Sequence, residues 1–191
     1  MAQSVDKNLV LLRHAKSAWP EDVPDHDRPL AGRGQRDAPA MGRWLHAAGH
    51  VPDQVLCSTA RRARETWQLA QAELGADPPV SFEQRIYQAS AAELLGLVRE
   101  KPSAVKTLLV VGHDPAIHEL ALMLAGTARP AGGGAGRDPA SQAALERMRA
   151  KFPTGAVAVL ALAASWGQLG RGKARLTEFV VPREVASAGG G

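Results

Sequence analysis

Three short apolar runs, each followed by a polar break and then by helical spacing, constrain the fold of this 191-residue chain more than any other feature. The runs are Leu9 to Leu12, Val55 to Cys57 and Thr107 to Val111. Runs of this length and composition predict buried strands, and their alternation with helices is typical of βαβ units. Because parallel strands end at one edge of a sheet, we expect the residues after the three runs to lie close together.

The remaining pattern predicts further strands at residues 80–82, 156–162 and 175–180, which gives a sheet of about six strands. Apolar spacing predicts a helix over residues 34–48, and a capping box at Ser90 and Glu93 begins another that ends at Arg99. Asp114-Pro115 is expected to start a helix whose N-terminal amides point toward the ends of the three strands. Residues 140–151 are expected to form a further, short helix. The sequence therefore predicts a three-layer α/β/α fold with a mainly parallel central sheet.

Length and composition predict a single domain over residues 1–186, since 191 residues with 45% hydrophobic content can bury one sizeable core. The glycine-rich segment 126–139 is expected to be a flexible insertion, and residues 187–191 a disordered tail. The single cysteine, Cys57, excludes an intrachain disulfide. Because no apolar stretch reaches about 18 residues, we expect no membrane association and a cytoplasmic location.

Arginine and histidine side chains follow the three runs. Arg13 and His14 come after the first, Arg62 after the second, and His113 after the third. A guanidinium offers paired donors to phosphoryl oxygens, and a neutral imidazole can attack phosphorus. An Arg-His pair alone is more often structural, so a phosphate-handling site requires that all four side chains converge.

The order of these motifs resembles the histidine phosphatase superfamily, which has the phosphoglycerate-mutase-like fold, and within it the SixA-type phosphohistidine phosphatases. The matching segments are Arg13-His14-Ala15-Lys16-Ser17, Arg28-Pro29-Leu30 with Gly32-Arg33-Gly34, Ser58 with Arg62-Ala63 and Thr66, Ile86-Tyr87, and Gly112-His113-Asp114-Pro115. The resemblance implies that His14 is the phosphorylated nucleophile, that Arg13 and Arg62 hold the phosphoryl group, and that His113 completes the pocket.

Two positions depart from the family pattern. Ala15 stands where the superfamily usually has glycine, which we interpret as a mark of the SixA-like branch. Gln88 stands where larger members place an acidic proton donor, and Glu83 is not expected to reach the pocket. The loop acids Asp22, Asp25 and Asp27 could substitute, although such a loop is more often simply solvated.

The missing acid predicts the substrate class. An alkoxide is hard to expel without an acid, whereas imidazole, whose conjugate acid has a pKa of about 6.5, leaves easily once its ring takes a proton from solvent. We therefore expect hydrolysis of phosphohistidine or other activated phosphomonoesters through a covalent phosphohistidine on His14. The alternatives are a broad small-molecule phosphomonoesterase or mutase, and a non-catalytic module that binds phosphohistidine.

Other site classes are not supported by the sequence. His46 and His50 lack the H-E-x-x-H pattern, so we expect no metal and no cofactor. Cys57 fails the C-x5-R signature of tyrosine phosphatases, because Ala63 occupies the arginine position. The net charge of +4 comes with scattered arginines, which argues against nucleic acid. The expected partner is a phosphorylated protein or a small phosphoester, and the oligomeric state is not predicted.

Overall fold

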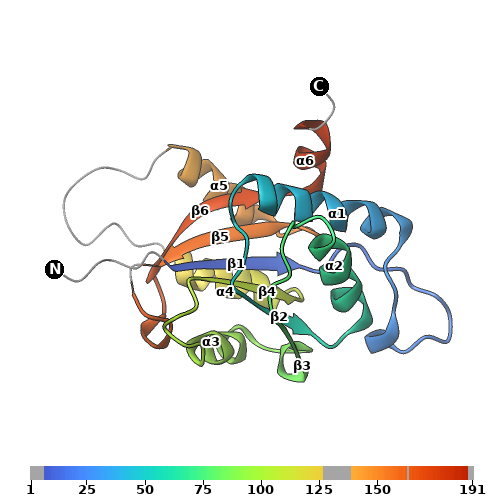
Figure 1. Ribbon diagram of the computed structural model, residues 1–191, viewed down its shortest axis with the longest axis horizontal. Helices are drawn as coiled ribbons and strands as arrows, with labels where there is room; N and C mark the ends of the chain where they lie inside the picture. The colour runs from blue at the N-terminus through green and yellow to red at the C-terminus, as the bar shows by residue number, and fades with distance from the viewer. Residues whose placement is uncertain (1–6, 127–138, 163, 189–191) are drawn as a thin grey trace.

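One six-stranded sheet forms the centre of the computed structural model, which describes residues 7–126, 139–162 and 164–188 (Figure 1). The strand order is β3-β2-β4-β1-β5-β6, with β1 at Lys7–Arg13, β2 at Gln54–Ser58, β3 at Val80–Glu83, β4 at Thr107–Gly112, β5 at Val157–Leu162 and β6 at Ala174–Val180. The first four strands run parallel, whereas β5 is antiparallel to both of its neighbours. The predicted number of strands and the mainly parallel sheet are confirmed.

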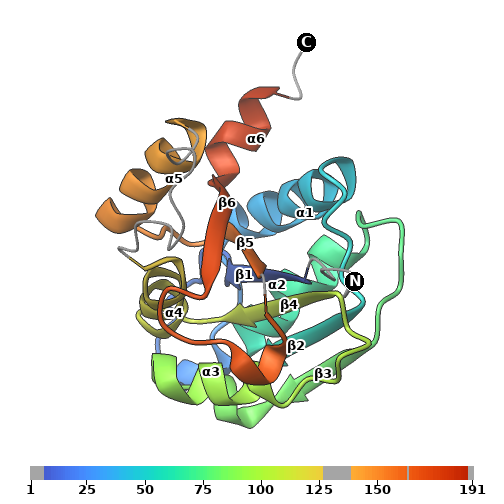
Figure 2. The same cartoon turned by 90° about the vertical axis from the view of Figure 1, so that its left-hand side faces the viewer.

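Helices cover both faces of the sheet, as Figures 1 and 2 show from two directions. Two of them, α1 at Gly32–Ala47 and α2 at Arg61–Gln71, cover one face, and α6 at Pro182–Ala188 packs beside α1. On the other face lie α3 at Ala91–Arg99, α4 at Ala116–Ala125 and α5 at Pro139–Ala150. Short 3-10 turns occur at Asp25–Asp27, Gln84–Ile86 and Trp166–Gln168. The three-layer α/β/α arrangement is therefore confirmed.

Both faces of strand β1 are buried, which explains why its apolar residues are continuous and do not alternate with polar ones. Leu9 and Leu11 point into the core beneath α3 and α4, whereas Val10 and Leu12 point into the core beneath α1 and α2. All four side chains are completely buried. A strand covered on both faces needs apolar residues at every position, and this produces a continuous run. The strand thus fixes the backbone that leads into Arg13 and His14.

The ends of several elements refine the sequence predictions. The capping box is present, with Ser90 accepting from the Glu93 amide and the Glu93 carboxylate accepting from the Ser90 amide. Residues 187 and 188 were expected to belong to a disordered tail, but they are the last two residues of α6. That helix begins at Pro182, whose fixed φ suits a first helical position. The predicted insertion lies outside the described residues from 127 to 138, as does the tail from 189 to 191.

Within the described residues, no helix combines the length and the apolar character needed to cross a bilayer.

Candidate active site

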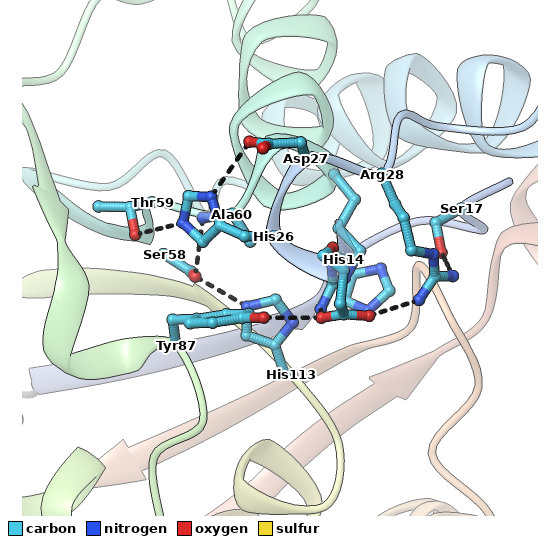
Figure 3. Close-up of polar contacts among 12 residues, drawn as sticks. His14, Ser17, His26, Asp27, Arg28, Ser58, Thr59, Ala60, Tyr87 and His113 are labelled. Atoms are coloured by element: carbon cyan, nitrogen blue, oxygen red, sulfur yellow. Dashed lines mark hydrogen bonds and ion pairs between the residues drawn. The ribbon is translucent and has the colours of Figure 1, made fainter. Parts of the chain in front are cut away.

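Three parallel strands deliver the candidate residues to one edge of the sheet. His14 follows β1, Ser58 ends β2, and His113 follows β4. The rings of His14 and His113 lie 5.1 Å apart between centroids, and Figure 3 shows the His113 ring beside Tyr87. Each histidine is less than a tenth exposed, as is Arg62. The structure therefore brings together the histidines that the sequence placed about a hundred residues apart.

The His14 ring is held in one orientation by its own backbone. Its Nδ1 lies 2.8 Å from the Ala15 carbonyl oxygen, and because a carbonyl only accepts, Nδ1 carries the proton. The other nitrogen, Nε2, then carries the lone pair. Burial is the main cause that lowers the pKa of His14 to about 3, and the positive charges of Arg62 and Arg13 act in the same direction. At neutral pH this imidazole is uncharged, as a nucleophile must be.

The two arginines approach the histidines from different elements. Arg13 ends β1, donates from Nη1 to the Phe152 carbonyl at 2.7 Å, and lies 3.8 Å from the Asp114 carboxylate. Burial lowers the pKa of Arg13 from its usual value, although the charge of Asp114 opposes this shift. Arg62 lies in the first turn of α2. Its charge lowers the pKa of both histidines, as does that of Arg13, so both cations act on the same small volume.

Ser58 fixes the second histidine. Its Oγ lies 2.7 Å from His113 Nε2 and accepts from the Ala60 amide at 3.3 Å. If the hydroxyl donates to Nε2, the ring proton resides on Nδ1. This Nδ1 is buried and has no hydrogen-bond partner among the described residues. A buried polar atom without a partner is costly, and a phosphoryl oxygen is a suitable acceptor for it.

Burial also lowers the pKa of His113, to about 4, and the neighbouring charge of Arg62 contributes to this shift. Both rings of the site are therefore neutral at pH 7.

Asp25, one of the three loop acids named above, contacts the site although its side chain is 49% exposed. Its carboxylate accepts from Arg28 at 2.8 Å, from Arg62 at 3.1 Å and from the Tyr87 hydroxyl at 2.8 Å. Its carbonyl oxygen also accepts from Arg62 Nη1 at 2.5 Å. Desolvation opposes the shift, but the bonds from Arg28 and Tyr87 and the charge of Arg62 lower the pKa of Asp25 to about 2.

The same loop is anchored by Arg28, which is itself buried. Its guanidinium donates to the Ser17 hydroxyl at 2.6 Å and to the Ala18 carbonyl at 3.0 Å, besides its bond to Asp25. The ring of Trp19 stacks over it, with its centroid 3.1 Å from the guanidinium carbon. Arg28 therefore ties the segment after His14 to the segment that presents Asp25.

Gln88 occupies the position where larger members of the superfamily have an acidic proton donor. Gln88 is exposed, and Glu83 bonds to Arg85 instead of entering the site, as expected. Tyr87 contacts Asp25 through its phenol, and desolvation and the Asp25 carboxylate raise the pKa of this phenol. Tyr87 thus remains protonated and donates to Asp25. Neither group is an efficient acid at neutral pH.

The backbone at position 15, where the superfamily usually has glycine, accommodates alanine. The described non-glycine residues with positive φ are Asp22 and Gln88, so Ala15 carries no backbone strain of that kind. Its side chain is completely buried, and its amide donates to the Thr66 hydroxyl at 2.9 Å. That hydroxyl donates in turn to the Arg62 carbonyl at 2.7 Å. Thr66 thereby connects the His14 loop to the helix that carries Arg62.

Alternative chemistries find little support in this geometry. Cys57 is completely buried, and burial raises the pKa of its thiol to about 12, so it is not a thiolate nucleophile. His46 bonds to the Leu74 carbonyl, whereas His50 bonds to Glu178. Within residues 7–126, 139–162 and 164–188, no group of three or more His, Cys, Asp or Glu side chains is arranged to hold a metal ion.

Comparison with known proteins adds four findings. A model of the histidine phosphatase superfamily (branch 1) matches residues 9–105. An uncharacterised protein of Mycobacterium tuberculosis is 43% identical over 172 residues, covering 90% of this chain and 100% of the relative. The structure of a candidate phosphohistidine phosphatase SixA from Nakamurella multipartita has a TM-score of 0.75 at 34% identity, covering 93% of this chain and 96% of that one. Its counterpart from Agrobacterium tumefaciens has a TM-score of 0.74 at 25% identity, covering 92% and 98%.

Proposed function

This chain belongs to the histidine phosphatase superfamily, and we propose that it hydrolyses phosphohistidine or other activated phosphomonoesters through a covalent phosphohistidine on His14. Family membership and the SixA-like neighbours support the general activity of a phosphatase. The observation that carries the finer proposal is the state of the His14 ring. It is neutral, and its Nδ1 proton is bound to the Ala15 carbonyl, which leaves Nε2 free to attack.

In the first step, the Nε2 lone pair forms a bond to phosphorus while the bond to the leaving group breaks. Arg13, Arg62 and the Nδ1 proton of His113 would neutralise the equatorial oxygens as charge spreads over them. The two guanidinium groups supply the positive charge that a divalent ion supplies in other phosphoryl-transfer sites, and the neutral His113 ring adds a hydrogen-bond donor, so we propose a metal-independent reaction. In the second step, water attacks phosphorus, the bond to Nε2 breaks, and inorganic phosphate leaves with His14 neutral again.

The leaving group decides the substrate preference. Asp25, with its pKa lowered to about 2, is ionised at neutral pH and cannot donate a proton. A phosphohistidine substrate needs no such donor if its ring is protonated by solvent, because neutral imidazole is then the leaving group. An alkyl phosphate must expel an alkoxide, which is far more basic. The site is therefore better suited to phosphohistidine and aryl phosphates than to glycerol phosphate.

The test compares three substrates: a phosphohistidine peptide, an aryl phosphate and glycerol phosphate. Wild-type protein should turn over the first two and trap labelled phosphate on His14 after an acid-free quench. His14→Ala should abolish turnover and labelling, whereas His46→Ala, which changes an exposed histidine outside the site, should retain both. Equal rates on glycerol phosphate would contradict the leaving-group reasoning. Release of one phosphate per protein without turnover would instead identify a binding module.

A further inference from the structure

A second cavity adjoins the candidate site, between α2 and the edge strand β3. Its volume is about 510 Å³, and its lining includes His26, Thr59, Arg64, Gln68, Val80 and Phe82. Val80 and Phe82 are two residues apart on β3, so they share one face of the strand. Phe82 is 51% exposed, although it is a large apolar side chain. The cavity thus presents apolar surface to solvent where the sheet ends.

Arg64 is the arginine in the lining of this cavity, which contains no carboxylate. Outside the lining, the Asp27 carboxylate lies 3.4 Å from Nδ1 of His26. Arg61 and Arg62, in the same turn of α2, pair with Glu65 and Asp25. Arg64 is exposed and forms no ion pair with the residues that the structure describes. A ligand with an acidic group would find an uncompensated cation beside an apolar wall.

The cavity is connected to the catalytic rings through His26. The His26 ring packs edge-on against Tyr87 at 4.8 Å, and Tyr87 lies 5.8 Å from His113 (Figure 3). His26 Nε2 also lies 3.0 Å from the Thr59 hydroxyl, which fixes the wall between the two spaces. The two centroid distances place the ring of His26, in the cavity wall, within about 11 Å of the His113 ring. An extended chain covers this distance in about three residues at ~3.3 Å each.

We propose that the cavity between α2 and β3 is a docking subsite for the polypeptide that carries the phosphoryl group, and that it takes an apolar side chain followed by an acidic one about three residues away. The inference rests on the proposed phosphatase function and specifies a protein as the substrate. A polypeptide can present an apolar and an acidic side chain to this cavity together, whereas a three-carbon phosphoester carries no such pair. Phe82 and Val80 contact the apolar side chain, and Arg64 pairs with the acid.

The experiment uses three phosphohistidine peptides that differ only in the residue pair placed three and four positions from the phosphorylated histidine, on both sides. The pairs are Leu-Glu, Leu-Lys and Gly-Gly, and an aryl phosphate serves as the small substrate. We expect wild-type kcat/KM to be about tenfold higher for Leu-Glu than for Gly-Gly, the effect of one modest contact. Arg64→Glu should shift the preference to Leu-Lys, and Phe82→Ala should remove the leucine contribution.

The control is Arg175→Glu, the same charge reversal at an exposed arginine on β6, the opposite edge of the sheet. All three variants change exposed side chains and should retain the wild-type melting temperature and aryl phosphate turnover. Equal wild-type kcat/KM on all three peptides, or an equal loss on peptides and aryl phosphate in Arg64→Glu, would overturn the docking proposal. Absence of turnover on every substrate, without labelling of His14, would instead overturn the proposed function.

Discussion

Gly34→Ala is predicted to destabilise the fold and to displace the loop that follows His14. Gly34 is buried near the start of α1, where the helix packs against the backbone of Lys16. A Cβ at this position would lie 2.2 Å from the Lys16 carbonyl oxygen and 3.0 Å from the Lys16 nitrogen. Backbone atoms cannot rotate away as the end of a side chain can. The helix or the loop must therefore move by about 1 Å to restore ordinary contact distances.

Two opposing effects set the magnitude. Replacing glycine by alanine inside a helix favours folding by about 1 kcal/mol. Overpacking a close contact costs about 1–3 kcal/mol, and contact between two backbones belongs at the upper end of that range. The net expectation is a loss of roughly 2 kcal/mol in the free energy of unfolding, or roughly 4–8 °C in melting temperature for a chain of this size. A shift of about 1 Å at the His14 loop should also lower kcat about 100-fold.

Thermal unfolding and steady-state turnover of an aryl phosphate measure the two effects. Gly96→Ala is the matched control, because Gly96 also lies within a helix, α3, but a Cβ there would meet nothing within 4 Å. This variant should gain up to about 1 kcal/mol and keep its activity. If Gly34→Ala melts at or above the wild-type temperature, the close approach of α1 to Lys16 does not limit packing. A lower melting temperature with unchanged kcat would refute the connection to the His14 loop.

Two further predictions concern charge. Asp25→Asn removes the carboxylate that competes with phosphate for Arg62. Competitive inhibition by inorganic phosphate should therefore become about tenfold tighter. Weaker inhibition would contradict the idea that Asp25 and phosphate compete for Arg62. Burial lowers the folded-state pKa of His113 to about 4, below its usual 6.5, so the unfolded chain takes up protons first as the pH falls. The free energy of unfolding should therefore decrease from pH 6.5 toward pH 4, by about 2 kcal/mol for this ring at pH 5. Denaturant titrations of wild type and His113→Asn test this, and an equal pH dependence in both would exclude the ring as the cause.

The sequence predicts well that His14 and His113 meet at one edge of the sheet, because the signals for the strands before them are local. Leu9 to Leu12 are a continuous apolar run typical of a buried strand, and a parallel sheet then brings His14 and His113 to one edge. The position of Asp25 depends instead on contacts with Arg62 and Tyr87, which lie 37 and 62 residues away. The hydrophobic periodicity of the sequence gives no information about side-chain contacts between such distant residues. The only local sign is the spacing of three residues between Asp25 and Arg28, which form an ion pair.

The sequence does not determine which atoms orient the two histidine rings. The structure identifies the Ala15 carbonyl oxygen as the partner of His14 Nδ1. The partner of His113, the Ser58 hydroxyl, becomes visible only when β2 and β4 are placed side by side. The end of α6 was missed for a different reason, since Ser187 and Ala188 have no strong preference and continue the helix that Pro182 begins.

The central position of β1 has a consequence for motion. The strand lies between β4 and β5, is hydrogen-bonded on both edges, and is covered on both faces. Backbone amides in such a strand exchange with deuterated solvent only when the whole domain opens. The proposed nucleophile, His14, therefore directly follows a strand whose backbone opens only with the whole fold.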